Sequence, residues 1–391
     1  MVYEKNWVKA WLGFGLVWFL GAIALAPSNK FYQQGLVLFL WVPMLLLAWP
    51  ARRVLVEAWR RQPAMWVSIV LLMVWGLISL AWTSAEDAGR EAKRLLYIFV
   101  FLLAFPMLAQ AGAARVRHLL QAGSAMLAFA AFVSIVHFYG LQGEPLNARL
   151  TGIGGISHPI LGAYVVAAAA LLLLYQMPRQ RLARAGWLLA LACMGAFVVL
   201  SQSRGAVLSL LFTLLLAPLW CRDRHSRVIA VMAIVSIGLA IFAMYDLLTA
   251  RGVSYRPQIF EVVLSMIDAH PWGGLGLGSS YRVSVAGLQF DHSHNMFTHV
   301  ALELGLPGML LWAVVWLFAL GEIVRARHTS MGKILLGLWV FSTMAMQFDA
   351  ASLTATPRAE WFVSWLPVAL VMLLPWMRAE NDACGKISGS T

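Results

Sequence analysis

Long apolar runs recur along almost the whole length of this 391-residue chain, and they restrict its fold more than any other feature. Each run is roughly 16 to 20 residues long, which is the length that a helix needs to cross about 30 Å of hydrocarbon. The strict alternation of apolar and polar residues that marks a membrane β-barrel is absent. Because 61% of the residues are hydrophobic and only 12% are charged, a soluble domain is excluded as well. The sequence therefore predicts an all-α, multi-pass integral membrane protein.

We expect about twelve transmembrane helices in a single transmembrane domain that covers residues 1–391. The predicted spans cover residues 10–26, 32–49, 64–82, 95–111, 118–139, 159–177, 185–201, 205–220, 228–246, 305–324, 333–348 and 360–377. Between the ninth and the tenth span, residues 247–304 form a loop that is far longer than a connection between helices requires. Loops of this length are usually functional, so we expect the chemistry of the protein there.

Most of the 29 Lys and Arg residues fall on one side of the predicted bundle when the N-terminus is placed inside. Cytoplasmic loops of membrane proteins carry such an excess of basic residues. We therefore expect both termini in the cytoplasm and the large loop on the outer face. The net charge of +12 then comes from the inner loops, which face the anionic lipids of the cytoplasmic leaflet. It gives no indication of nucleic-acid binding.

The large loop contains an amphipathic segment, SYRPQIFEVVLSMIDAH, at residues 254–270. Pro257 suits the first turn of a helix, and the segment therefore predicts a short helix that lies in the membrane interface. The amide groups at the N-terminus of this helix, together with Arg256, would form a site for an anion. The apolar residues that fall on one helical face are Ile259, Phe260, Val263, Met266 and Ile267.

Arg204 lies in SQSRGAVLSLL, residues 201–211, at the outer end of a hairpin between two predicted spans. An arginine there can extend to lipid headgroups, or it can hold phosphate oxygens with two parallel N–H groups. The chain has no Asp-x-Asp motif, the spacing by which many sugar transferases hold a divalent ion. We therefore expect no metal ion and no cofactor, with arginines neutralising a leaving phosphate group.

Three of the nine histidines lie in HSHNMFTHVALELGLPG, residues 292–308. An imidazole can accept a proton from a hydroxyl group near neutral pH, because its ordinary pKa is about 6.5. The segment thus suggests a general base, with His294 as first candidate, His292 and His299 as rivals, and a purely structural role as the alternative. His158 lies at the outer end of the sixth span, where it either borders a substrate cleft or makes a local hydrogen bond at the helix end.

These motifs resemble those of the O-antigen ligases, which belong with polymerases and protein O-oligosaccharyltransferases to one superfamily. Ligases carry a histidine followed by Asn, Ser or Gln, then nine residues and Gly-x-x-Gly. The chain has His294-Asn295, residues 296–304, and Gly305-Leu306-Pro307-Gly308. Ligases also carry Arg-x-x-x-Leu after a transmembrane hairpin, which residues 204–208 match, and His270 with its following glycines resembles the superfamily's loop signature.

The resemblance implies an inverting glycosyltransferase that acts in lipopolysaccharide biosynthesis without metal or nucleotide and is similar to the type C enzymes. Its donor would be a polysaccharide on undecaprenyl diphosphate and its acceptor the lipid A core oligosaccharide, at the periplasmic face of the bacterial inner membrane. By motif, His294 would be the general base, while Arg204 and Arg256 would hold the donor diphosphate. Asp291 or Asn295 would orient the imidazole.

Two other functions remain open on the sequence alone. A polymerase or a protein O-oligosaccharyltransferase would use the same donor and could use the same base, although the ligase spacing and the lack of an extra periplasmic domain favour a ligase. A transporter is disfavoured, because the spans carry few carboxylates, no inverted repeat is evident, and the unusual polar residues gather on one face.

Overall fold

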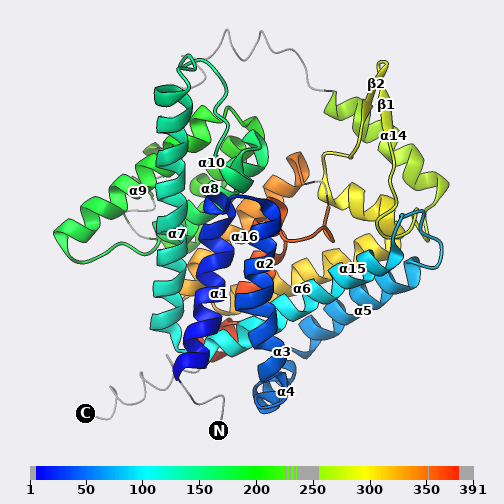
Figure 1. Cartoon of the computed structure of the whole chain (residues 1–391), viewed down its shortest axis with the longest axis horizontal. Coiled ribbons are helices and arrows are strands. Elements are labelled where there is room, and N and C mark those ends of the chain that lie inside the picture. Colours follow the sequence, from blue (N-terminus) through cyan, green and yellow to red (C-terminus); the bar gives the residue numbers. More distant parts are fainter. Residues whose placement is uncertain are drawn as a thin grey trace.

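The computed structural model describes residues 6–222, 255–350 and 352–377, together with a few positions between 224 and 235. Most of the predicted ninth span, 228–246, and the first part of the large loop, 247–254, lie outside the described residues. The described chain is mainly helical (Figure 1). The first half contains α1 (Asn6–Leu25), α2 (Asn29–Leu36), η1 (Val37–Trp41), α3 (Val42–Ala48), α4 (Arg52–Arg61), α5 (Pro63–Ser79), α6 (Ala88–Ala109), α7 (Ala113–Ile135), η2 (Val136–Leu141), η3 (Gly154–Ile156) and α8 (Pro159–Leu174).

The second half adds the described part of the predicted large loop, from residue 255 onward, and the helices on either side of it. Its elements are α9 (Arg181–Leu200), α10 (Arg204–Leu216), α11 (Pro218–Cys221), α14 (Arg256–Ala269), β1 (Val283–Val285), β2 (Leu288–Phe290), α15 (Met296–Arg325), α16 (Ser330–Phe348), η4 (Ala359–Phe362) and α17 (Trp365–Val371). In Figure 1, α14 and the two strands lie together at one corner of the molecule, beyond the N-terminal end of α15.

Helices of membrane-crossing length confirm the multi-pass class, although they do not confirm a count of about twelve. Each predicted span outside 228–246 overlaps a helix of the structure. Among the described residues, seven helices are long and apolar enough to cross a membrane, or eight if the bent pair α4 and α5 forms one span. Shorter apolar helices include Ala10–Leu25, Pro159–Leu174 and Ala359–Val371.

The core of the bundle surrounds α8, whose alanine, valine and leucine side chains are almost all buried. Helices α7, α9, α10 and α16 pack around it. The small side chains of Ala167, Ala168 and Ala169 allow close approach of these neighbours, as is usual where membrane helices pack. This packing places the N-terminal end of α8 near the N-terminus of α10 and the C-terminal end of α16.

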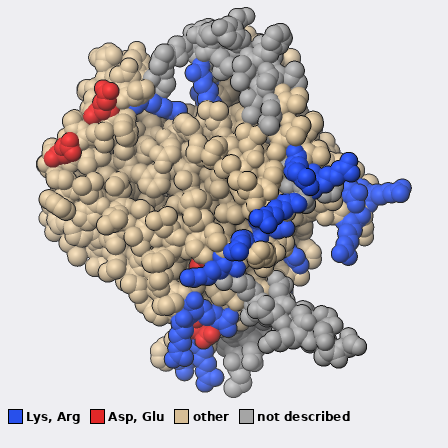
Figure 2. Space-filling model, turned by 180° about the vertical axis from the view of Figure 1, so that it is seen from behind, with Lys and Arg blue, Asp and Glu red and all other residues tan. Residues whose placement is uncertain are grey.

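The surface of the bundle is also typical of a membrane protein. Figure 2 shows a broad face with few charged groups and an arc of Lys and Arg side chains along one rim. An uncharged face suits hydrocarbon, and basic side chains are expected where a bundle meets lipid headgroups. The cytoplasmic position of both termini stays a prediction.

Strands β1 and β2 correct the expectation of an all-α fold. They pair antiparallel, with Ser284 opposite Gln289. The two residues between them, Ala286 and Gly287, both have positive φ angles, 50° and 77°, which is the conformation that a two-residue hairpin turn requires. The hairpin, α14 and α15 share a second small core: Ile259, Val263, Ile267, Val283, Val285, Ala301 and Leu302.

Helix α14 therefore buries much of its apolar face against protein. Ile259, Val263 and Ile267 are buried as expected, whereas Phe260, expected on the same face, is 45% exposed. The position of helix α14 in a membrane interface stays a prediction.

Helix α15 begins at residue 296, earlier than the predicted span at 305, because the chain is helical on both sides of a kink at Gly305. Gly305 has φ 68° and ψ −178°, a backbone conformation that is open essentially only to glycine. A Cβ atom there would lie 2.4 Å from the carbonyl oxygen of Trp272. The kink thus lets the glycine-rich loop, residues 271–278, dock on α15.

Candidate active site

Residues 291–295, which we call the histidine turn, join β2 to α15. Asn295 is the N-cap of α15, and its Oδ1 accepts hydrogen bonds from the amides of Phe297 and Thr298. Its Nδ2 donates to Oε1 of Gln347 at 2.8 Å, which ties the turn to the C-terminal end of α16. His294 has a φ of 53°, a left-handed conformation that is uncommon for residues with a side chain. The turn is therefore fixed at both ends while it holds His294 in a strained backbone conformation.

Asp349, the first residue after α16, faces both imidazoles of the histidine turn. Its Oδ1 lies 3.4 Å from Nε2 of His292 and 3.5 Å from Nδ1 of His294. The two imidazole rings have centroids 3.9 Å apart. Asp291 instead contacts Nδ1 of His292, at 2.6 Å. The carboxylate beside His294 is thus Asp349, whereas Asp291 contacts His292 and Asn295 caps α15.

The pKa values of these groups follow from their contacts. Burial alone would raise the pKa of Asp349, but interactions with His292 and His294 outweigh it and hold that pKa well below its usual range. Burial would lower the pKa of His292, but the carboxylates of Asp349 and Asp291 outweigh it and raise that pKa. A hydrogen bond from His292 lowers the pKa of Asp291. A permanent negative charge therefore lies beside His294 across the neutral pH range.

Arg204 is the first residue of α10 and is exposed at the same end of the bundle as Asp349. Its neighbour Gly205 sets this position by close packing. A Cβ atom on Gly205 would lie 2.8 Å from Cβ of Phe348, which directly precedes Asp349, and 2.7 Å from the hydroxyl of Tyr164. The backbone that carries the guanidinium therefore lies against the end of α16 that carries the carboxylate.

Arg256 opens α14 on another side of the histidine turn. The ring of Tyr255, directly before it, lies 6.2 Å from the ring of Phe290, and Phe290 meets His294 edge-on at 6.0 Å between centroids. Arg256 also lies within electrostatic range of Tyr164, whose hydroxyl lies close to the first turn of α10. The structure thus brings both predicted phosphate-binding arginines to the region around His294.

His158 makes the local hydrogen bond at a helix end that was one of its two predicted roles. It is the N-cap residue of α8, where its Nδ1 accepts a hydrogen bond from the amide of Leu161 at 3.3 Å. It also lies within electrostatic range of Asp349 and His294, and burial lowers its pKa. The hydrogen bond of His158 is therefore local, within α8, while its side chain lies in electrostatic range of the cluster around Asp349.

The spacing of the His-Asn-x9-Gly-x-x-Gly motif has a direct structural meaning. Asn295 starts α15, residues 296–304 form the helix up to the kink, and Gly305 opens the backbone for the glycine-rich loop. The amide of Leu275 donates to the carbonyl of Leu302, and the amide of Gly276 to that of Glu303. These two hydrogen bonds hold the glycine-rich loop against the last residues of α15 before the kink.

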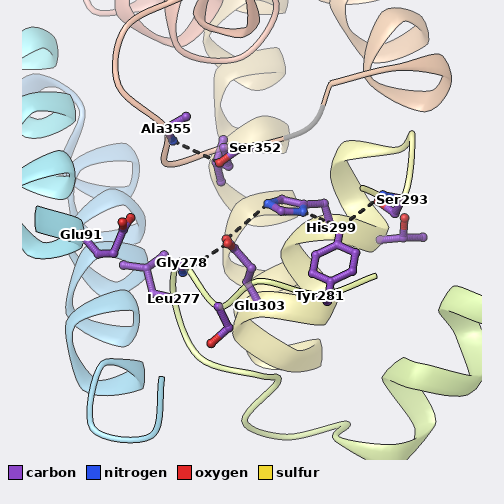
Figure 3. Close-up of polar contacts among 12 residues, drawn as sticks. Glu91, Leu277, Gly278, Tyr281, Ser293, His299, Glu303, Ser352 and Ala355 are labelled. Carbon is purple, nitrogen blue, oxygen red and sulfur yellow. Dashed lines mark hydrogen bonds and ion pairs between the residues drawn. The ribbon is translucent and has the colours of Figure 1, made fainter. Parts of the chain in front are cut away.

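Tyr281, His299 and Glu303 link the histidine turn to the glycine-rich loop (Figure 3). The hydroxyl of Tyr281 accepts a hydrogen bond from the amide of Ser293 and lies 2.8 Å from Nδ1 of His299. Nε2 of His299 lies 3.4 Å from Oε2 of Glu303, and Oε1 of Glu303 accepts from the amide of Gly278. His299, predicted as a rival base, is therefore 5% exposed and engaged in a structural network.

His292, His294 and Asp349 offer ligand atoms that all lie within 4.8 Å of one another, so the trio could hold a metal ion. Asp349 belongs to this cluster although the sequence motifs do not identify it. The signal that could have pointed to it is a lone carboxylate directly after an apolar run that ends on the outer face.

Comparison with known proteins identifies relatives of the same kind as the motifs. Residues 189–313, which include Arg204, Arg256 and the histidine turn, match the family model described as O-antigen ligase. The chain is 29% identical over 312 residues to the O-antigen ligase of Pseudomonas aeruginosa, and the match covers 78% of this chain and 76% of that protein.

Proposed function

We propose that this chain is an inverting, metal-independent O-antigen ligase, which its match to the O-antigen ligase family model and its 29% identity to a curated O-antigen ligase support. It transfers a polysaccharide from undecaprenyl diphosphate to the lipid A core oligosaccharide, at the periplasmic face of the inner membrane. Both termini then lie in the cytoplasm, and membrane lipids surround the bundle. The observation that carries the proposal is the convergence of an imidazole, a buried carboxylate and two arginines at one end of the bundle.

In this proposal His294 is the general base. Its Nδ1 faces Asp349, so Nδ1 carries the proton and Nε2 is free to accept one from the acceptor hydroxyl. The hydroxyl oxygen attacks the anomeric carbon of the donor as the bond from that carbon to the diphosphate oxygen breaks. Asp349 stabilises the imidazolium that forms, in the same way that a buried carboxylate supports a histidine base in hydrolases.

Arg204 and Arg256 hold the leaving diphosphate. Two permanently charged guanidinium groups can neutralise its growing charge with bidentate hydrogen bonds, which is the task that a divalent ion performs in many other sugar transferases. Both arginines also sit at helix N-termini, of α10 and α14, where backbone amides favour an anion.

The proposal is tested with purified protein in liposomes, undecaprenyl-diphosphate-linked polysaccharide and lipid A core. We expect transfer without ATP and in the presence of EDTA, with mass analysis showing the polysaccharide on the core sugar. Dependence of the transfer on a divalent ion would overturn metal independence, and the trio His292, His294 and Asp349 would then be the candidate ligands. Elongation of the donor polysaccharide in place of transfer to the core would instead identify a polymerase.

A further inference from the structure

A cavity of about 370 Å³ opens beside the histidine turn. Its volume lies in the ~300–1,000 Å³ range of small-molecule sites. The walls come from the segment that follows the glycine-rich loop, from the first residue of the histidine turn and from α15: Ser279, Ser280, Tyr281, Arg282, Asp291 and His299. The proposed base and the proposed phosphate-binding arginines are not among these residues.

One imidazole ring separates this cavity from the catalytic carboxylate. Asp291, in the cavity wall, contacts Nδ1 of His292 at 2.6 Å, and Nε2 of the same ring lies 3.4 Å from Asp349. The ring of His294 lies directly beside that of His292. A ligand held in the cavity is therefore placed next to the base, on the side of His292 away from Asp349.

The inner wall of the cavity is fixed before a ligand arrives. Tyr281 is held by Ser293 of the histidine turn and by His299 of α15, and His299 in turn faces Glu303 (Figure 3). The Tyr281 hydroxyl accepts from the Ser293 amide, and it can donate its own proton to Nδ1 of His299 when that nitrogen is unprotonated. This network holds the aromatic ring and the hydroxyl of Tyr281 in place at the cavity wall, so that ligand binding costs no conformational entropy for this side chain.

The polar groups around the cavity offer both hydrogen-bond donors and acceptors. Arg282 donates, Asp291 accepts, and the hydroxyls of Ser279 and Ser280 can do either. Asp291 is 83% exposed at its side chain and stays ionised because its hydrogen bond with His292 lowers its pKa. A phosphate group is disfavoured beside this carboxylate, whereas the vicinal hydroxyls of a sugar suit such a mixed lining.

We propose that this cavity is the acceptor subsite and that it binds a sugar residue of the acceptor oligosaccharide, with Arg282 and Asp291 holding its hydroxyl groups. This inference rests on the proposed function, because it assigns the second substrate of the same reaction. In this proposal the donor diphosphate contacts Arg204 and Arg256, whereas the acceptor sugar contacts Arg282 and Asp291.

Arg282→Ala tests the proposal, because Arg282 is exposed and its removal leaves intact the small core that the hairpin, α14 and α15 share. We expect KM for the lipid A core to rise about tenfold to a hundredfold, the effect of losing a charge-assisted hydrogen bond. KM for the donor and kcat stay within about threefold of wild type. Gln289→Ala, at an exposed position of the same hairpin outside the cavity, is the matched control and keeps the wild-type acceptor KM.

A binding measurement without the donor separates this proposal from the proposed function. Saturation-transfer NMR with deacylated core oligosaccharide is expected to give signals with the wild type and the Gln289→Ala variant, and to lose them with Arg282→Ala. Equal signals from all three proteins, or a wild-type acceptor KM for Arg282→Ala, would overturn the subsite assignment. Oligosaccharide binding without any transfer by the wild type would instead reject the ligase reaction and leave a sugar site.

Discussion

The replacement Asp349→Asn removes the negative charge beside His294 and keeps the shape of the side chain. In the proposed reaction His294 becomes an imidazolium 3.5 Å from this carboxylate. The loss of the charge should therefore slow the chemical step, while binding of the donor through Arg204 and Arg256 continues.

The size of the effect follows from the geometry. The side chain of Asp349 is 5% exposed and that of His294 is 19% exposed, so solvent screens the pair only in part. At an effective dielectric constant of about 20, two unit charges at this separation attract by about 4–5 kcal/mol. The amide oxygen of asparagine keeps a fraction of this attraction, and about 1.4 kcal/mol corresponds to a tenfold rate. We expect kcat to fall by about 10²–10³-fold.

The assay is transfer in liposomes under saturating donor and acceptor, with thermal unfolding of each variant followed by intrinsic fluorescence. Asp268→Asn, at an exposed carboxylate of α14, is the matched control and keeps full activity. A folded Asp349→Asn protein with kcat within about threefold of wild type would refute the assignment of Asp349. A loss of activity together with a loss of the folded state would be resolved by Asp349→Glu, which restores the charge and part of the rate.

Four further outcomes test other parts of the site. His294→Ala abolishes transfer without unfolding the bundle, and retained ligation would move the base to another residue. Arg204→Lys loses most activity, since lysine cannot make the bidentate phosphate contact; full activity would return Arg204 to a role at lipid headgroups. Gly305→Ala lowers the free energy of unfolding by at least about 1–3 kcal/mol because of its backbone conformation, measured against Gly195→Ala, whose added Cβ meets no neighbouring atom. Because the pKa of His292 is raised in the folded state, its protonation stabilises the fold, fully so below about pH 6.5. This stabilisation is lost as the pH rises through the folded-state pKa. The melting temperature of the wild type therefore falls over that range, while that of His292→Gln does not.

Apolar periodicity predicts the bundle well because hydrocarbon imposes one requirement on every span, the internal pairing of all backbone groups. Each predicted span that the structure describes overlaps a helix. The hairpin at 283–290 is different, because each strand has only three residues, which is too short for the alternation of Val-Ser-Val and Leu-Gln-Phe to stand out. The start of α15 at residue 296 is difficult to predict, because Gly305 and Pro307 indicate a helix boundary, whereas the chain is helical on both sides of the kink at Gly305.

The residues of the site can be predicted where a motif lies in one stretch of sequence. The prediction fails where segments that are distant in the sequence meet. His294 and Arg204 are predicted from local motifs and Arg256 from its position at the start of a helix in the large loop, and the structure brings all three to one region. Asp349 follows His294 by more than fifty residues, and its position depends on how α16 packs against α10 and the histidine turn. Sequence adjacency favours Asp291 for the same task, but the side chain of Asp291 meets the neighbouring ring, His292.

The left-handed backbone of residue 294 restricts which amino acids can replace the imidazole during evolution. Asparagine and glycine adopt this conformation with the least strain, whereas β-branched and bulky residues are poorly accommodated there. A descendant of this chain that lost its enzymatic role by drift would therefore keep Asn or Gly at the position, with the hairpin and the helix start unchanged. Such a substitution at residue 294 would then mark a homologue that has lost the proposed activity and kept the fold.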